Sequence, residues 1–304
     1  MKPLEVEEPI DVWVHRPLAY LLARALMPTP VSPNFVTLCS IVCGLASGAA
    51  IFLGQGSWHL PVAGALLFLS AVLDCADGQL ARLRKSSSPL GRMLDGVADL
   101  IVSSVVVLGG AFLVLAKYRD PPWLLAPVGV MVLATIVTSS FHTTMYDHYK
   151  NVYLRLTHEN YREGEDLGTA EQRHRMAAGT DPFWLRACWV IYLFYLRSQT
   201  QYVRGFDPFT KTRLADFPAA GPRNASIYRR YAGPLMRLWR NYLGFGSLVF
   251  GLAVSIAFNV AEYYMVVRLV LLNALFYGHM RPGQRRASEL SFAEMSAARE
   301  PPVA

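Results

Sequence analysis

Long apolar stretches with few charged residues constrain the fold of this chain most. Four of them are residues 34–54, a stretch that starts at residue 60, residues 93–115 and residues 123–146. A helix of about 20 residues crosses a hydrocarbon core of about 30 Å. Two shorter apolar stretches, residues 243–258 and 263–277, follow a polar region. Because helices and closed barrels are the structures that span bilayers, the pattern predicts an all-α membrane protein with six transmembrane helices.

The segments between these stretches predict the remaining parts. Residues 11–27 mix arginines with apolar and aromatic side chains, which indicates an amphipathic helix along the membrane interface before the first span. The excess of Lys and Arg between spans four and five places that insertion and both termini in the cytosol. The predicted parts are 1–30 (tail and interfacial helix), 31–146 (spans one to four), 147–240 (cytosolic or interfacial insertion), 241–280 (spans five and six) and 281–304 (disordered tail).

Charge and cysteine content narrow the class of partner and site. The formal net charge of +7 fits the anionic headgroups of a lipid bilayer, and we expect no nucleic-acid partner. The four cysteines, Cys39, Cys43, Cys75 and Cys188, lack the C-x-x-C spacing of zinc sites. We interpret them as buried, reduced thiols, with Cys75 placed by helix packing.

A cluster of acidic residues stands at the ends of the second and third apolar stretches. Asp74 and Asp77 lie three residues apart, and Gly78, Ala81 and Arg82 follow on the same helical face. After a break at residues 86–89, Gly91, Asp95 and Asp99 repeat every four residues on a second helix.

Four carboxylates near hydrocarbon repel one another, so the arrangement requires protons or cations between them. Oxygen ligands of this kind favour Mg²⁺ or Mn²⁺. We therefore predict one or two divalent ions in a water-filled cavity that opens to the cytosol.

The spacing D-x-x-D-G-x-x-A-R, then eight residues, then G-x-x-x-D-x-x-x-D resembles the signature of the CDP-alcohol phosphotransferases. Enzymes of this family cleave a CDP-linked alcohol, transfer its phosphoryl-alcohol part to a hydroxyl acceptor and release CMP. The resemblance covers about residues 30–145 well, and it implies a homodimer. It assigns the metal to Asp74, Asp77, Asp95 and Asp99, the CMP part of the donor to Asp74, Gly78, Ala81 and Arg82, and the general base to Asp99.

Two further residues extend the resemblance to the nucleotide. Pro33, Asn34 and Thr37 are similar to the P-N-x-x-T start of many family members, where this region lies beside the nucleotide. Asn34 and Thr37 are therefore candidates for cytidine contact, although Asn34 also suits a helix entry.

The motif does not decide which molecule is the acceptor. Relatives that use phosphorylated acceptors commonly have a basic residue directly after the last motif aspartate, and this chain has Leu100. That difference favours transfer of a phosphatidyl group from CDP-diacylglycerol to a small polar alcohol such as serine. The alternative is transfer from a small CDP-alcohol, of the choline or ethanolamine type, to a lipid acceptor.

Two rival classes also fit a cluster of intramembrane acids. A prenyltransferase would bind Mg²⁺-diphosphate and release diphosphate in place of CMP. A cation transporter would use the acids as an ion path, with carboxylates spread along the membrane normal.

Two arginines near the spans have more ordinary interpretations. Arg268 lies within the sixth apolar stretch, where snorkelling or pairing with Glu262 is favoured over a functional role. Arg84 is interpreted as a solvated charge of a cytosolic loop.

Overall fold

The computed structural model describes residues 3–86, 89–158, 167–177, 182–207, 209–210, 213 and 221–297. Every regular element in these ranges is helical. The first helices are a π-helical turn Asp11–His15, α1 (Arg16–Leu26), α2 (Pro33–Leu53), α3 (His59–Leu83), α4 (Pro89–Lys117), a 3₁₀ turn Pro122–Leu124 and α5 (Leu125–Thr157). Then follow α6 (Leu167–Ala177), α7 (Phe183–Phe206), α9 (Pro222–Tyr242), α10 (Phe245–Ala257), α11 (Ala261–Val266), α12 (Asn273–Leu275) and α13 (Arg281–Ala297), with π-helical segments Val267–Leu272 and Phe276–Met280 on either side of α12.

Four helical stretches in the described chain are long and apolar enough to cross a membrane: Pro33–Leu53, His59–Leu83, Gly96–Lys117 and Pro122–Thr157. They coincide with the first four predicted spans. The fifth predicted span is α10, which has only 13 residues, and the sixth falls on the chain of short segments after it. The helical membrane character is confirmed, whereas the count of six spans stays a prediction.

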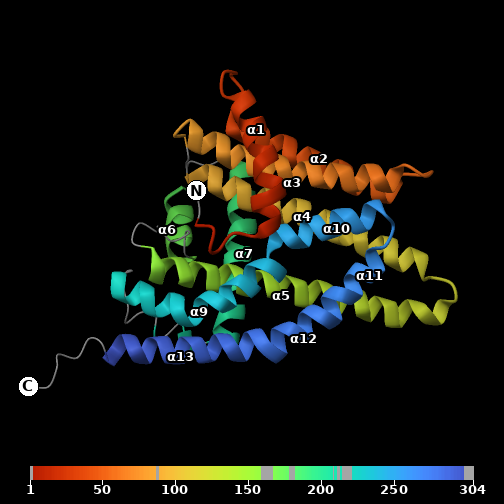
Figure 1. Cartoon of the computed structure of the whole chain (residues 1–304). Helices are drawn as coiled ribbons and strands as arrows, with labels where there is room; N and C mark the ends of the chain where they lie inside the picture. The colour runs from red at the N-terminus through yellow and green to blue at the C-terminus, as the bar shows by residue number, and fades with distance from the viewer. Residues whose placement is uncertain are drawn as a thin grey trace, which may run out of the picture.

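Helix α3 lies at the centre of the N-terminal half, with α1, α2 and α10 packed around it (Figure 1). Small polar side chains join α2 to α3: Ser40 Oγ donates to the carbonyl of Ser70 at 2.9 Å, and Ser70 Oγ donates to that of Ser40 at 2.8 Å. Helix α4 packs on the other side of α2. A Cβ at Gly48 would lie 2.1 Å from Val105 Cγ1, so this glycine lets α2 and α4 approach closely.

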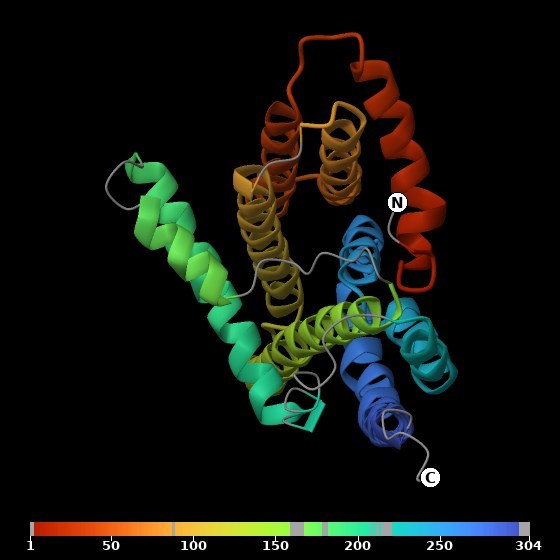
Figure 2. The same ribbon diagram turned by 90° about the vertical axis from the view of Figure 1, so that its left-hand side faces the viewer.

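A second layer is formed by α5, α9 and α13, which lie against one another beside the first (Figures 1 and 2). Its core contains large aromatic side chains that are almost fully buried: Tyr228, Trp239, Phe276 and Phe292. Helix α5 links the layers, because it also contacts α4.

The structure corrects the predicted boundaries in the C-terminal half. Residues 281–297 were expected to be part of a disordered tail, but they form α13, which buries Ala287, Ser288, Phe292 and Met295 against α9. The burial of this stripe explains the order. Residues 298–304 of that prediction lie outside the described residues.

The region predicted as an insertion also contains more helix than the sequence indicates. Helix α5 continues beyond residue 146 to Thr157, and the apolar run at residues 183–196 is part of the 24-residue helix α7. Helix α7 is not among the four candidate spans of the described chain.

Candidate active site

A cavity of about 570 Å³ lies between the two layers. Its lining comes from α2, α3, α4, α5, α7, α10, the N-terminal segment and the helical segment that begins at residue 261. The charged or titratable residues in the lining are Glu8, Asp11, His15, Asp74, Cys75, Asp99, Tyr146, Asp147, Lys150, Tyr195, Tyr264 and Arg268.

We call Asp74 on α3 and Asp99 on α4 the motif wall of this cavity. The first and last aspartates of the motif are 25 residues apart in sequence, and both line the same cavity. Helices α3 and α4 each pack along α2, and both contribute residues to the cavity lining. The structure thus brings together the two ends of the predicted constellation.

Asp77 is held just outside the cavity lining. It is 5% exposed, and Thr37 Oγ1 on α2 donates a short hydrogen bond to its Oδ2. The same hydroxyl lies 3.2 Å from the carbonyl of Pro33. Thr37 therefore fixes the orientation of a motif carboxylate from the neighbouring helix.

The remaining predicted residues lie at or beyond the edge of the motif wall. Asn34 is exposed on the first turn of α2, and Ala81 is half-buried on α3. The Arg82 guanidinium lies over Gly78, since a Cβ built on that glycine would be 3.4 Å from Arg82 Nη1. Asp95 belongs to α4, and its side chain is outside the part of the chain that the structure describes.

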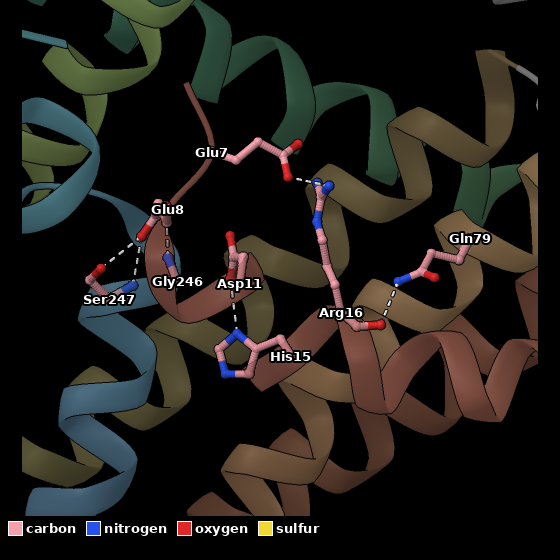
Figure 3. A network of polar contacts seen from close by, with 8 residues as sticks. All are labelled: Glu7, Glu8, Asp11, His15, Arg16, Gln79, Gly246 and Ser247. Carbon is pink, nitrogen blue, oxygen red and sulfur yellow. Dashed lines mark hydrogen bonds and ion pairs between the residues drawn. The ribbon is translucent and has the colours of Figure 1, made fainter. Parts of the chain in front are cut away.

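Another part of the cavity lining is formed by the segment before α1, and we call Glu8, Asp11 and His15 the N-terminal wall (Figure 3). Glu8 is 5% exposed and accepts hydrogen bonds from the backbone of Gly246 at 3.2 Å and of Ser247 at 2.8 Å. These amides are at the first turn of α10, where a carboxylate is favourable.

The close approach of this wall depends on a glycine. A Cβ on Gly244 would lie 1.9 Å from Glu8 Cδ, so a larger residue there would displace the carboxylate. Burial raises the pKa of Glu8, and the charge of Asp11 raises it further, while the hydrogen bonds from Ser247 and Gly246 oppose the rise.

Arg268 lies in the cavity and not at the membrane surface. It is 2% exposed; its Nε donates to Ser139 Oγ at 2.8 Å and its Nη1 to the hydroxyl of Tyr264 at 3.2 Å. Glu262, the expected partner, is paired with Lys117 instead. The predictions of snorkelling and of a Glu262 pair are therefore wrong, because α5 supplies the partner from 129 residues away.

Arg84 also differs from its interpretation as a solvated charge. Its guanidinium donates to four backbone carbonyls at the end of α1 and in the connection to α2, those of Leu26 (2.7 Å), Met27 (3.5 Å), Thr29 (2.8 Å) and Val31. These hydrogen bonds join the end of α1 to the C-terminal end of α3, and the last carbonyls of a helix favour a cationic partner.

The electrostatics of the cavity suit a divalent cation. Five carboxylates line it, those of Glu8, Asp11, Asp74, Asp99 and Asp147, against the two cationic side chains Lys150 and Arg268. Lys150 is already within 2.5 Å of Asp147. Carboxylates gathered in this way are stable with a cation among them, and their all-oxygen donor set fits Mg²⁺ or Mn²⁺.

The comparison with known families decides among the classes that such a site admits. The sequence model of the CDP-alcohol phosphatidyltransferase family matches residues 30–157, which include the motif and all of α2 to α5. The match covers less than half of the chain, and it includes the four candidate spans. Together, the match and these apolar helices support an integral membrane protein.

Several curated relatives resemble this domain. A cardiolipin synthase (CMP-forming) from Oryza sativa is 28% identical over 126 residues, covering 39% of this chain and 38% of the relative. Cholinephosphotransferase 1 of Gallus gallus is 31% identical over 38% of this chain and 36% of its own length. A CDP-diacylglycerol–glycerol-3-phosphate 3-phosphatidyltransferase of Cereibacter sphaeroides is 32% identical over 35% of this chain and 47% of its own. The chain spans less than half the length of each.

The sequence reasoning missed several cavity residues: the N-terminal wall and Arg268, which lie outside the matched range, and Asp147 and Lys150, which lie within it. Asp11 and His15 are four residues apart in the amphipathic segment, a spacing that brings two side chains together on a helix. An intramembrane charge such as Arg268 is by default a sign of function. Both features are visible in the sequence. The residues that Glu8 and Arg268 contact, however, lie on helices that are distant in sequence.

Proposed function

We propose that this chain is a CDP-alcohol phosphotransferase of phospholipid synthesis. It transfers a phosphatidyl group from CDP-diacylglycerol to the hydroxyl of a small polar alcohol and releases CMP. The observation that carries the proposal is the motif wall: Asp74 and Asp99 line one cavity within the matched domain.

The motif residues have different proposed roles. Asp74, Asp77, Asp95 and Asp99 would hold one or two Mg²⁺ or Mn²⁺ ions, with Thr37 orienting Asp77. When bound, the ions neutralise the diphosphate and the charge that develops on the leaving CMP.

Other groups would bind the nucleotide and accept the proton of the acceptor hydroxyl. Gly78 leaves room for a phosphate beside the Arg82 guanidinium, and Ala81 continues that surface towards the CMP part. Asn34 and Thr37 at the start of α2 stay our candidates beside the cytidine. Asp99 would accept the proton of the attacking hydroxyl, the role that the family resemblance implies for the last motif aspartate.

The presence of Arg268 in the cavity lining supports an acceptor with an anionic group. Arg268 Nη2 is buried and has no hydrogen-bond partner in the described part of the chain. A guanidinium binds a carboxylate through paired hydrogen bonds, so a serine-like acceptor fits both Arg268 and the apolar Leu100 beside Asp99.

In the alternative, the type of reaction is the same, but the lipid is part of the acceptor and not of the CDP-linked donor. A small CDP-alcohol would donate to a lipid hydroxyl, and the similarity to a cholinephosphotransferase supports this arrangement. A cation transporter is less well supported, because the carboxylates gather at one cavity and do not line a path. A cytosolic active site, cytosolic termini and a homodimer are further expectations from charge distribution and family resemblance.

The direct test is a CMP-release assay with purified protein in lipid. Mn²⁺ and CDP-diacylglycerol are supplied with one acceptor at a time, namely serine, glycerol, glycerol phosphate or inositol phosphate. A parallel reaction contains CDP-choline and diacylglycerol. CMP release that requires serine supports the proposal, release in the parallel reaction supports the alternative, and failure of every donor to yield CMP contradicts both.

A further inference from the structure

Helix α7 lies against the part of α4 that leads to Asp99. It packs on both α4 and α5 (Figure 2). Leu94 of α4 packs against a cluster that includes the buried Trp189 of α7. Two residues further along α4, a Cβ on Gly96 would lie 3.4 Å from Cε2 of the Tyr192 ring. Side chains of α7 are therefore in contact with the motif segment of α4.

Tyr195, which follows Tyr192 on α7, brings a hydroxyl group to the cavity. Tyr195 and Asp99 both line the cavity. The residue is 38% exposed, but burial of its hydroxyl end raises the pKa of Tyr195, and the charges of Asp147 and Asp99 raise it further. The hydroxyl therefore keeps its proton at neutral pH, and it is within electrostatic reach of both carboxylates.

A neighbour on the same helix fixes the orientation of this hydroxyl. Gln199 Nε2 donates a hydrogen bond to Tyr195 Oη at 2.7 Å. Because the amide supplies the hydrogen of this bond, the O–H of Tyr195 can donate to a further oxygen atom. Gln199 itself lines a polar pocket of about 220 Å³ between α5 and α7, which shares Thr144 and Asp147 with the main cavity.

The place of Tyr195 in the chain indicates which substrate it meets. Under the proposed function, the motif residues within the matched range 30–157 bind the metal and the CMP part, which all CDP-linked donors share. Helix α7 lies outside that range. The attacking hydroxyl must lie beside Asp99, its proposed base, because proton transfer requires hydrogen-bond distance. A donor group that α7 places near Asp99 therefore faces the acceptor.

We infer that Tyr195 binds the acceptor alcohol by donating a hydrogen bond from its hydroxyl to an acceptor oxygen in the cavity. Gln199 is the positioning residue that holds the tyrosine hydroxyl for this contact. The inference rests on the proposed function and adds to it a binding residue from outside the matched range. Since the contact is to the acceptor and not to the donor, its loss changes one Michaelis constant and not the other.

Steady-state CMP release separates the two substrates. The full-length protein in lipid is assayed with Mn²⁺, CDP-diacylglycerol and serine, or the other acceptor of the panel that supports CMP release, and each substrate is varied in turn. Tyr195→Phe removes the hydroxyl alone, so the acceptor KM should rise by about 2–10-fold, the contribution of one hydrogen bond. The KM for CDP-diacylglycerol should stay the same. Gln199→Leu, which keeps the tyrosine, should raise the acceptor KM by a smaller factor.

Tyr202→Phe is the matched control on the same helix. Tyr202 is 44% exposed, its ring packs against Phe141 at 5.9 Å, and it is outside the cavity lining of the described chain. This variant should leave both Michaelis constants unchanged. Circular dichroism checks that each variant is helical.

The outcomes distinguish the inference from the proposed function. If the unmodified protein releases CMP, an unchanged acceptor KM in Tyr195→Phe, or an equal rise in both Michaelis constants, would overturn the inference alone. If the unmodified protein releases no CMP with any acceptor, the proposed function is contradicted and the inference is overturned with it.

Discussion

The two walls of the cavity differ in how they relate to the family. Asp74 and Asp99 of the motif wall lie within the matched residues 30–157, and their spacing alone indicated their chemistry. The N-terminal wall and Arg268 lie outside that range, yet they face the same cavity. The difference teaches that the flanking segments of this chain contribute to a cavity whose motif residues come from the matched domain. Under the proposed function, the domain would bind the metal and CMP, and the flanking segments would lie where the acceptor binds.

The largest effect is expected on the motif wall. Asp99→Asn removes the proposed base, so turnover should fall by about 10²–10⁴-fold while binding of the CMP part is retained. CMP release and CMP binding measured on the same preparation check this. Asp120→Asn, an exposed residue of the outer loop, is the matched control and should keep turnover. Unchanged turnover in Asp99→Asn would remove this residue from the mechanism.

A smaller and different effect is expected from a change at Arg268. Arg268→Gln removes a charged hydrogen bond to the acceptor, worth about 1.5–3 kcal/mol, so the acceptor KM should rise about 10–100-fold. The KM for the CDP-linked donor should stay the same. The exposed Arg285→Gln is the control for loss of charge alone. An unchanged acceptor KM would mean that Arg268 has a purely structural role between Ser139 and Tyr264.

Loss of the contact from α2 that supports the motif wall should weaken metal binding by about tenfold. Thr37→Val removes the hydroxyl that orients Asp77, and outer-shell changes of this kind weaken metal binding by about 10–100-fold. The measurement is the Mn²⁺ concentration that gives half-maximal CMP release. Thr37→Ser keeps the hydroxyl and should restore it. Equal metal dependence of the Val and Ser variants would argue against a positioning role.

The smallest effect concerns how the N-terminal wall is held. Gly244→Ala forces a methyl group into the position of the Glu8 carboxylate and should destabilise the protein by about 1–3 kcal/mol, seen as a lower melting temperature in lipid. Gly205→Ala, on α7 with open space around it, should melt at the same temperature or slightly higher. Equal melting of the two variants would show that Glu8 is not tightly docked.

Sequence reasoning predicted the local features of this protein better than its long-range ones. The motif aspartates and the helices that carry them follow from periodicity, and a break in the apolar pattern marks where α3 ends. Arg268 was assigned to the wrong partner, because Ser139 reaches it across a helix interface that leaves no periodic signal.

The C-terminal half shows the same limit in another form. Helix α13 is polar on average, so a disordered tail was predicted. It is ordered by the burial of Phe292 and Met295 near Tyr228, and that contact depends on how α9 and α13 pack. Likewise, the surroundings of His15 depend on Phe68 of α3 and Phe250 of α10, and the residues next to His15 in sequence do not predict these contacts.

The central claim is that the motif wall binds a divalent cation together with a CDP-linked substrate, and equilibrium dialysis of CMP tests it most directly. The account predicts one CMP bound per chain with Mn²⁺ present, little without it, loss of binding in Asp74→Asn and full binding in Arg268→Gln. CMP binding that is independent of Mn²⁺, or that survives in Asp74→Asn, would contradict the account.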